Sequence, residues 1–190
     1  MEAVNRIDTS FEIIEEGIKN CTQCPLYKNR THSVPGEGPE NPSLMLIGEA
    51  PGKNEDLQGK PFVGAAGKKL NELLENAGIK RSEIFITSVN KCRPPENRPP
   101  TKDEAEMCMH LWLTPQMHLL KPKVIGLMGR TAISYVMGED FSYNLEKDHG
   151  KIIEKDGKKF VLLYHPAAMI YNQKLKQTME TDFKNLGKSL

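Results

Sequence analysis

The stretch from Leu44 to Gly67 constrains the fold of this chain more than any other. It begins with LMLI, a short apolar run that is typical of a buried strand. A long loop rich in glycine and proline follows from Gly48, and the next segment, KKLNELLENAG, has helical periodicity that ends at Gly78. In open α/β sheets, ligands bind where a strand delivers such a loop to its carboxyl end. The alternative is that these glycines and prolines only shape a surface loop.

Strand-like and helix-like segments alternate along the rest of the chain. Further strands are expected at 83–89 (EIFITSV), at 124–128 (VIGLM), and as a hairpin of 151–155 with 159–164 around Asp156-Gly157. Helices are expected from the cap Thr9-Ser10 to about Asn20, at 68–76, from Lys102, after Gly129, and from about Leu175 to the end. This alternation predicts an α/β fold with a mostly parallel sheet covered on both faces, in one domain spanning 1–190.

The helix from Lys102 carries two local signals. Thr101 and Glu104 have the spacing of a capping box, which places the helix start at Lys102. Pro115 lies in the same helical pattern and is expected to kink the helix or divide it in two, because proline lacks the amide donor.

Charge and composition exclude some partners. The formal net charge is +1, so nucleic-acid binding would depend on local basic clusters and not on a global positive field. No apolar run approaches the roughly 20 residues that cross a bilayer, and the N-terminal sequence lacks the layout of a signal peptide. We therefore expect a cytoplasmic protein that does not enter membranes.

The four cysteines indicate a metal site. Clustered thiols in a cytosolic protein bind metal more often than they form disulfides. Cys21 and Cys24 have the CxxC spacing, and Cys92 and Cys108 complete a set of four if the fold brings them to the N-terminus. Four such ligands hold zinc or a 4Fe–4S cluster, and the spacing alone slightly favours zinc. Four unrelated buried thiols are the remaining alternative.

Three of the predicted strands end in unusual polar loops. These loops are GEAPG from Gly48, NKCRPPENR from Asn90, and HPAAM from His165. Because parallel strands end at one edge of a sheet, the three loops should meet there and form one active site.

The residues in these loops suit a flat heterocycle with carbonyls and a ring N–H. Phe62 can form a stacking platform, with a core phenylalanine as the alternative. His165 can donate to a developing oxyanion, or its ring can be satisfied by local backbone. Glu49 and Glu55 can orient a water, balance a sugar cation or shape the pocket, and the alternatives are solvated loop acids or helix caps.

Several motifs together resemble the family 4 uracil-DNA glycosylases, the iron–sulfur branch of their superfamily. They are CTQCPLYKNRT, VPGEGP, GEAPGKNEDLQGKPFVGAAGKKLNELL, KCRPPENRPPT and HPAAM, in that order. The resemblance implies a three-layer α/β/α fold with a four-stranded parallel sheet. It also implies a 4Fe–4S cluster on Cys21, Cys24, Cys92 and Cys108, which reverses the slight preference for zinc. The implied reaction hydrolyses the N-glycosidic bond of deoxyuridine in DNA, releasing uracil.

The resemblance also implies roles for single residues. Glu49 and Asn97 match positions linked to the catalytic water and sugar, and His165 matches the donor to uracil O2. Phe62 matches the ring stacked on uracil, and Glu55 a pocket acid that crowds C5 against thymine. Met169 matches an apolar wedge that fills the hole left by a flipped nucleotide. The remaining expected contacts are Gly48, Ala50, Ser88 and Asn90 with the base, and Arg98 with DNA.

One departure concerns base recognition. Related enzymes often carry Asn four residues before the third cysteine, where this chain has Ser88. A serine cannot give the paired contacts of an amide. Strand alternation would point Asn90 to the same side, so Asn90 is expected to substitute in part. Tyr171 also stands where a basic residue is common. The loop CRPPENR lacks the basic, histidine-containing segment of covalently trapping relatives, so no covalent link is expected.

The prediction from sequence is a monomeric, monofunctional uracil-DNA glycosylase that acts on uracil-containing DNA. One rival is a superfamily member acting on another deaminated base, such as hypoxanthine. A rival of another class is a metal-stabilised DNA-binding module with little catalysis.

Overall fold

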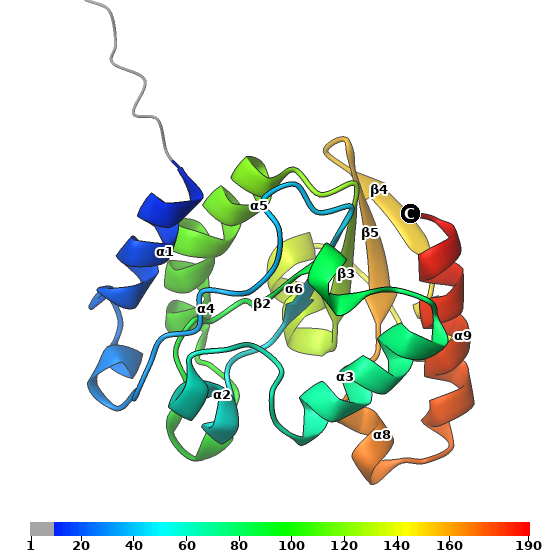
Figure 1. The fold of residues 1–190 in the computed structure, drawn as a ribbon, viewed down its shortest axis with the longest axis horizontal. Helices are drawn as coiled ribbons and strands as arrows, with labels where there is room; N and C mark the ends of the chain where they lie inside the picture. The colour runs from blue at the N-terminus through cyan, green and yellow to red at the C-terminus, as the bar shows by residue number, and fades with distance from the viewer. Residues whose placement is uncertain (1–9) are drawn as a thin grey trace, which may run out of the picture.

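A mixed sheet of five strands, in the order β2-β1-β3-β5-β4, runs through the middle of the molecule. The computed structural model describes residues 10–190 (Figure 1), so the predicted cap at Thr9 lies outside the described residues. The strands are β1 (Leu44–Gly48), β2 (Phe85–Ser88), β3 (Val124–Met128), β4 (Ile152–Lys155) and β5 (Lys158–Leu163). Strands β2, β1, β3 and β5 are parallel, and β4 runs antiparallel to β5.

The predicted α/β class is confirmed, but the sheet has one strand more than the four expected from the resemblance. The fifth strand is the first arm of the predicted hairpin. At its turn, Asp156 and Gly157 both have positive φ (50° and 72°), as a tight two-residue hairpin turn requires. The turn brings Ile152 opposite Val161, so β4 adds to the edge of the sheet.

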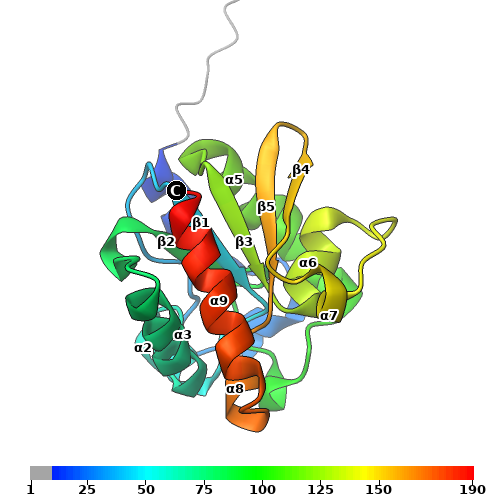
Figure 2. The ribbon, with the colours of Figure 1, turned by 90° about the vertical axis from the view of Figure 1, so that its right-hand side faces the viewer.

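Helices cover both faces of the sheet (Figures 1 and 2). The described helices are α1 (Phe11–Lys19), α2 (Lys53–Gln58), α3 (Ala65–Asn76), α4 (Lys102–Cys108), α5 (Thr114–Leu120), α6 (Arg130–Met137), α7 (Leu145–Asp148), α8 (Ala168–Tyr171) and α9 (Leu175–Lys188). One core cluster packs α3 and α9 against the sheet, with Leu70 and Phe183 among its fully buried side chains. A second cluster packs α4, α5 and α6 against the opposite face.

Two short helices lie in segments for which the sequence predicted no helix. Helix α2 lies inside the loop that follows β1, and α7 lies within 140–150. Helix α2 begins after Gly52 and ends at Gly59, whose φ of 67° is the left-handed conformation that closes helices. With six residues, α2 has too few turns to produce a helical periodicity in the sequence.

Pro115 divides its helix, as predicted. Helix α4 begins with the full capping box of Thr101 and Glu104, and a π-turn (Met109–Leu113) then connects it to α5. Pro115 lies in the first turn of α5, and the backbone keeps helical angles from the π-turn into that helix. The wider turn accommodates the proline ring without ending the helical course of the chain.

Between residues 10 and 190, none of the helices combines the length and the apolarity that a bilayer crossing requires.

Candidate active site and cysteine cavity

A cleft of about 770 Å³ opens at the carboxyl edge of the parallel strands. Each of these strands contributes to its wall: Glu49 follows β1, Ser88 ends β2, Gly129 follows β3, and His165 follows shortly after β5. The sequence predicted that the loops after three strands meet at one site. The loop after β3 joins them there. Seven of the predicted site residues line this cleft: Glu49, Ala50, Glu55, Phe62, Ser88, Asn97 and His165.

The ring of His165 is held in a defined tautomer. The amide of Ala167 donates to its Nδ1 at 3.2 Å, so in the neutral ring the proton resides on Nε2. Burial lowers the pKa of His165 to about 4, while the carboxylate of Glu55 acts in the opposite direction. The ring therefore stays neutral at physiological pH and keeps one N–H available to a ligand in the cleft.

Phe62 lies beside His165 and combines both roles that the sequence left open. Its ring centroid is 5.7 Å from that of His165, with an angle of 34° between the rings. The side chain is only 8% exposed and belongs to the core cluster under α3, yet it also lines the cleft. A ring fixed in the core with one part at the cleft wall is a rigid platform for a flat ligand.

The carboxylate of Glu55 is used by the loop that carries Phe62. Its Oε1 accepts hydrogen bonds from the amides of Val63 at 2.9 Å and Gly64 at 2.8 Å. Glu55 thus fixes the backbone of this loop and at the same time lines the cleft.

Glu49 and Asn97 each have a neighbour that orients them. The hydroxyl of Thr131, in the first turn of α6, donates to Oε2 of Glu49. Nε of Arg93 donates to Oδ1 of Asn97 at 2.7 Å. Asn97 has a φ of 55°, a left-handed conformation that asparagine tolerates better than most residues. The two side chains that were predicted to act on the water and the sugar are therefore both held at the cleft.

Four predicted residues are not brought to the cleft wall. Gly48 lies behind the ring of Phe62, because a Cβ added to it would be 2.7 Å from Cζ of that ring. Arg98 donates two 2.8 Å hydrogen bonds to Glu104 while 40% of its side chain stays exposed, so its contact with DNA remains a prediction. Asn90 and Met169 are both buried.

The predicted substitution of Asn90 for the missing amide does not fit its position. Strand β2 ends at Ser88, so strand alternation does not extend to Asn90. Its backbone amide donates to the carbonyl of Glu49, and its side chain donates to the carbonyl of Glu104 at 2.9 Å. Ser88 alone represents β2 in the cleft wall.

Met169 is also placed differently from the expected wedge. Its side chain is 4% exposed and belongs to the core cluster, because the short helix α8 turns it toward the sheet. The exposed apolar side chains of α8 are Ile170, at 41%, and Tyr171, at 88%.

Sequence reasoning missed Thr131 as a site residue and gave no role to Arg81. Thr131 had a usable signal, because GRT follows a predicted strand just as GEAPG and HPAAM do. Arg81 had none, because it lies between a helix and a strand and contacts the loop that carries Phe62 only through the fold.

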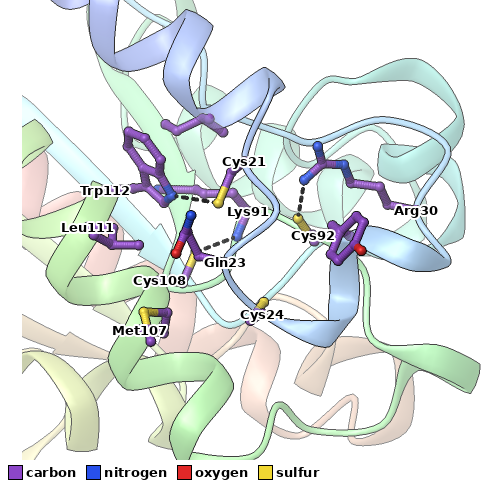
Figure 3. A pocket seen from close by; sticks show the side chains of 12 residues that line it. Cys21, Gln23, Cys24, Arg30, Lys91, Cys92, Met107, Cys108, Leu111 and Trp112 are labelled. Carbon is purple, nitrogen blue, oxygen red and sulfur yellow. Dashed lines mark hydrogen bonds between the residues drawn. The ribbon is translucent and has the colours of Figure 1, made fainter.

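The four cysteines line a second cavity (Figure 3), which three distant parts of the chain surround. Cys21 and Cys24 follow α1, Cys92 follows β2, and Cys108 ends α4. Three sulfur atoms accept N–H donors: Cys21 from Trp112 Nε1 at 3.3 Å, Cys92 from Arg30 Nη1 at 3.1 Å, and Cys108 from the Lys91 amide at 3.3 Å. Within residues 10–190, no three His, Cys, Asp or Glu side chains converge on a single metal-ion position.

Burial opposes thiolate formation in this cavity. It raises the pKa of Cys24 and Cys92, and it raises the pKa of Cys108 to about 12. The positive charges of Arg30 and Lys91 act in the opposite direction on Cys92 and Cys108 respectively. The N–H donors and the two cations therefore offset only part of the cost of burying a thiolate here.

The amino-acid sequence of the chain matches one known superfamily. Residues 35–186 match the uracil DNA glycosylase superfamily, and the chain belongs to it. Within it, the chain is 42% identical to a type-4 uracil-DNA glycosylase of Archaeoglobus fulgidus, over 94% of this chain and 92% of the relative. The type-4 enzyme of Sulfurisphaera tokodaii is 44% identical over 93% and 83%, and that of Thermotoga maritima is 42% identical over 86% and 84%.

Proposed function

We propose that this chain is a monofunctional type-4 uracil-DNA glycosylase that acts in base excision repair. It removes uracil from DNA by hydrolysing the N-glycosidic bond and leaves an abasic site. The observation that carries the proposal is the meeting of Glu49, Phe62, Asn97 and His165 in one cleft, with a neutral histidine whose Nε2–H is available. Membership of the superfamily and similarity to type-4 enzymes along nearly the whole chain support it.

The proposed reaction begins with a deoxyuridine that leaves the base stack and enters the cleft. Uracil stacks on Phe62, and the N–H of His165 donates to its O2 as negative charge develops there. The bond from C1′ to N1 lengthens, so that the bonding electrons stay with uracil and positive charge develops on the sugar. Glu49 and Asn97 hold the water that attacks C1′. The hydroxyl of the water stays on the sugar. The proton that the water loses is matched by the proton that the uracil anion takes up, so that neutral uracil is released.

Recognition of the base falls to the remaining wall of the cleft. Ser88 offers one hydroxyl to the edge of the base, and Ala50 supplies part of the wall. Glu55 limits the space near C5 through the loop that it fixes. Gly48 contributes by leaving room for the ring of Phe62. Because a single hydroxyl replaces paired amide contacts, we expect weaker discrimination between bases than an amide would give.

We further propose a 4Fe–4S cluster on Cys21, Cys24, Cys92 and Cys108. Such a cluster takes four thiolate ligands, and the cavity presents four cysteines together with three N–H donors to sulfur. Bound there, the cluster would cross-link the N-terminal segment to α4. We also propose that residues 1–190 act as one domain.

A uracil-release assay tests the function. Purified protein is incubated with a labelled oligonucleotide that contains one deoxyuridine, and free base and abasic sites are measured. We expect free uracil together with alkali-labile sites. Release of hypoxanthine from a matched oligonucleotide but not of uracil would identify a different substrate. Binding without release of either base would indicate a DNA-binding module and contradict the proposal.

A further inference from the structure

The backbone of Phe62 is held in a conformation that its side chain disfavours. Its φ is 50°, in the left-handed region that is uncommon and strained for a bulky residue. Such a conformation persists only where the surroundings impose it. Two glycines pack closely against Phe62. A Cβ added to Gly67 would lie 1.9 Å from the carbonyl oxygen of Phe62, and one added to Gly48 would lie 2.7 Å from the ring of Phe62.

Arg81 holds the carbonyl side of this loop. Its Nη2 donates to the carbonyl of Pro61 at 2.7 Å, and its Nη1 makes a longer 3.4 Å contact with that of Phe62. Nη1 also donates to Oδ1 of Asn71 on α3 at 3.0 Å. Glu37 lies 3.7 Å from Nη2 and balances the charge. The fixed fork of a guanidinium is what allows one side chain to hold two successive carbonyls.

Glu55 holds the amide side of the same loop, at Val63 and Gly64. The loop 61–64 is thus fixed from both directions, with a cation on its carbonyls and a carboxylate on its amides. Glu55 lines the cleft, whereas Arg81 stands outside the residues that line it. Arg81 therefore cannot be explained as a contact to the base.

We propose that Arg81 is a positioning residue for uracil recognition. It fixes the strained backbone at Phe62 and thereby keeps the ring in place beside His165, ready to stack on the base. The inference rests on the proposed function, because it concerns the same cleft. In the absence of the Arg81 contacts, the carbonyls of Pro61 and Phe62 lose these donors, and the strained backbone can relax enough to tilt the ring away from its position beside His165.

The experiment compares Arg81→Ala and Arg81→Lys with Lys80→Ala as the matched control. Lys80 is the neighbouring cation, and its partner is Glu83 on the surface. For each variant we measure inhibition by free uracil, the single-turnover rate on uracil-containing DNA, the affinity for abasic DNA and the melting temperature. Base–aromatic stacking is worth about 1–3 kcal/mol, so Phe62→Ala should weaken uracil binding between about 5-fold and about 150-fold.

Arg81→Ala should weaken uracil binding and slow the single-turnover rate by a substantial part of the factor expected for Phe62→Ala. Its affinity for abasic DNA should be unchanged. Arg81→Lys should recover some of it, because an ammonium can still hold one carbonyl. Lys80→Ala should match the wild type. In a Phe62→Ala background, Arg81→Ala should cause no further loss, because there is no ring left to position.

Wild-type uracil binding in a folded Arg81→Ala variant, or full additivity with Phe62→Ala, would overturn the inference. Arg81→Met is the second variant if Arg81→Ala does not fold, because it keeps an apolar stem and removes both donors. Wild-type uracil affinity in a folded Arg81→Met variant would also overturn the inference. If the wild-type protein releases no uracil from DNA, the proposed function itself fails, and this outcome is distinct from any result with the variants.

Discussion

The proton on His165 determines what this side chain can do in the cleft. The Ala167 amide occupies Nδ1, and burial keeps the ring neutral, so Nε2–H is the group left for a substrate oxygen. A neutral donor gains strength as the oxygen becomes an anion, without first holding a charge of its own. The sequence left the local backbone contact and the catalytic role as alternatives. The backbone contact is present, and in the proposed role it is the contact that leaves Nε2–H free to donate.

Replacing His165 should therefore affect the rate and leave DNA binding nearly intact. Losing one preorganised oxyanion donor costs roughly 100- to 1000-fold in rate in other enzymes. We expect His165→Ala to fall in that range under single-turnover conditions, with unchanged iron content and melting temperature. His165→Asn should recover part of the loss, because an amide still donates. Cleavage by His165→Ala at the wild-type rate would rule out this role.

The lowered pKa of His165 also predicts a pH dependence of stability. The folded pKa is about 4 and the ordinary value is 6.5, so between these values the unfolded chain binds a proton that the folded chain does not. The contribution to stability is therefore complete above about pH 6.5 and falls as the pH decreases toward 4. Urea unfolding at pH 7 and pH 5 measures it. His165→Asn should lose less stability between the two pH values than the wild type, and an equal loss would contradict the prediction.

At the level of elements, the short helix α8 presents two different faces. Met169 points into the core beneath it, whereas Ile170 and Tyr171 face outward. Helix α8 follows the His165 segment directly, which is where the wedge was expected. However, Met169, the residue that matches the family position, is buried. The sequence predicted a loop at HPAAM, but Ala168–Tyr171 form one helical turn. The direction of each side chain on this turn decides which residue is exposed.

Met169→Ala should accordingly behave as a core truncation. Removal of a buried methionine side chain typically costs about 2–5 kcal/mol, so the melting temperature should fall. Any loss of activity should be similar on U·A pairs, on U·G pairs and on single strands. A wedge would instead affect U·A most, because a mismatched base costs less to extrude. A selective loss on U·A with unchanged stability would show that Met169 leaves the core during the reaction.

The strands and long helices could be predicted because hydrophobic periodicity and capping signals are local. Leu44–Ile47 and Val124–Met128 were placed correctly on that basis, and the capping box fixed the start of α4. The details that were predicted wrongly depend on pairing between distant segments or on elements too short to show a period. The fifth strand depends on pairing across a hairpin, and α2 is too short to show a period. The side-chain directions of Asn90 and Met169 depend on where β2 ends and on the turn of α8.

In the site, too, some residues were predictable from local sequence signals and others depend on contacts that only the fold creates. Strand order and parallel direction brought the polar loops together, so the loops alone indicated that Glu49, Glu55, Phe62 and His165 would meet at the cleft. Their supports were not: Thr131, Arg93 and Arg81 act through contacts that the fold creates. The family resemblance supplied the chemistry, because spacing alone left zinc and a cluster as open alternatives.

At the scale of the whole molecule, the cysteine cavity and the cleft are joined through Lys91. Its amide donates to the Cys108 sulfur. Its buried Nζ donates to the carbonyl of Ser88 at 2.8 Å and to the hydroxyl of Thr87 at 2.6 Å. Ser88, which ends β2 in the cleft wall, is thus held by the residue that precedes Cys92 and contacts the sulfur of Cys108. A group that fixes these two cysteines would therefore also help to fix this wall of the cleft.

Removing one cysteine should therefore reduce stability first and activity as a consequence. Cys108→Ala deletes one of the four proposed ligands, and we expect loss of iron, loss of the broad visible absorbance, a lower melting temperature and poorer solubility. Met107→Ala is the matched control, because Met107 lines the same cavity on the same helix without being a proposed ligand. It should keep its iron. Anaerobically purified wild-type protein that contains zinc and no iron would exclude the cluster. Full iron content in Cys108→Ala would remove Cys108 from its ligands, because the cavity then holds the metal through the other cysteines alone.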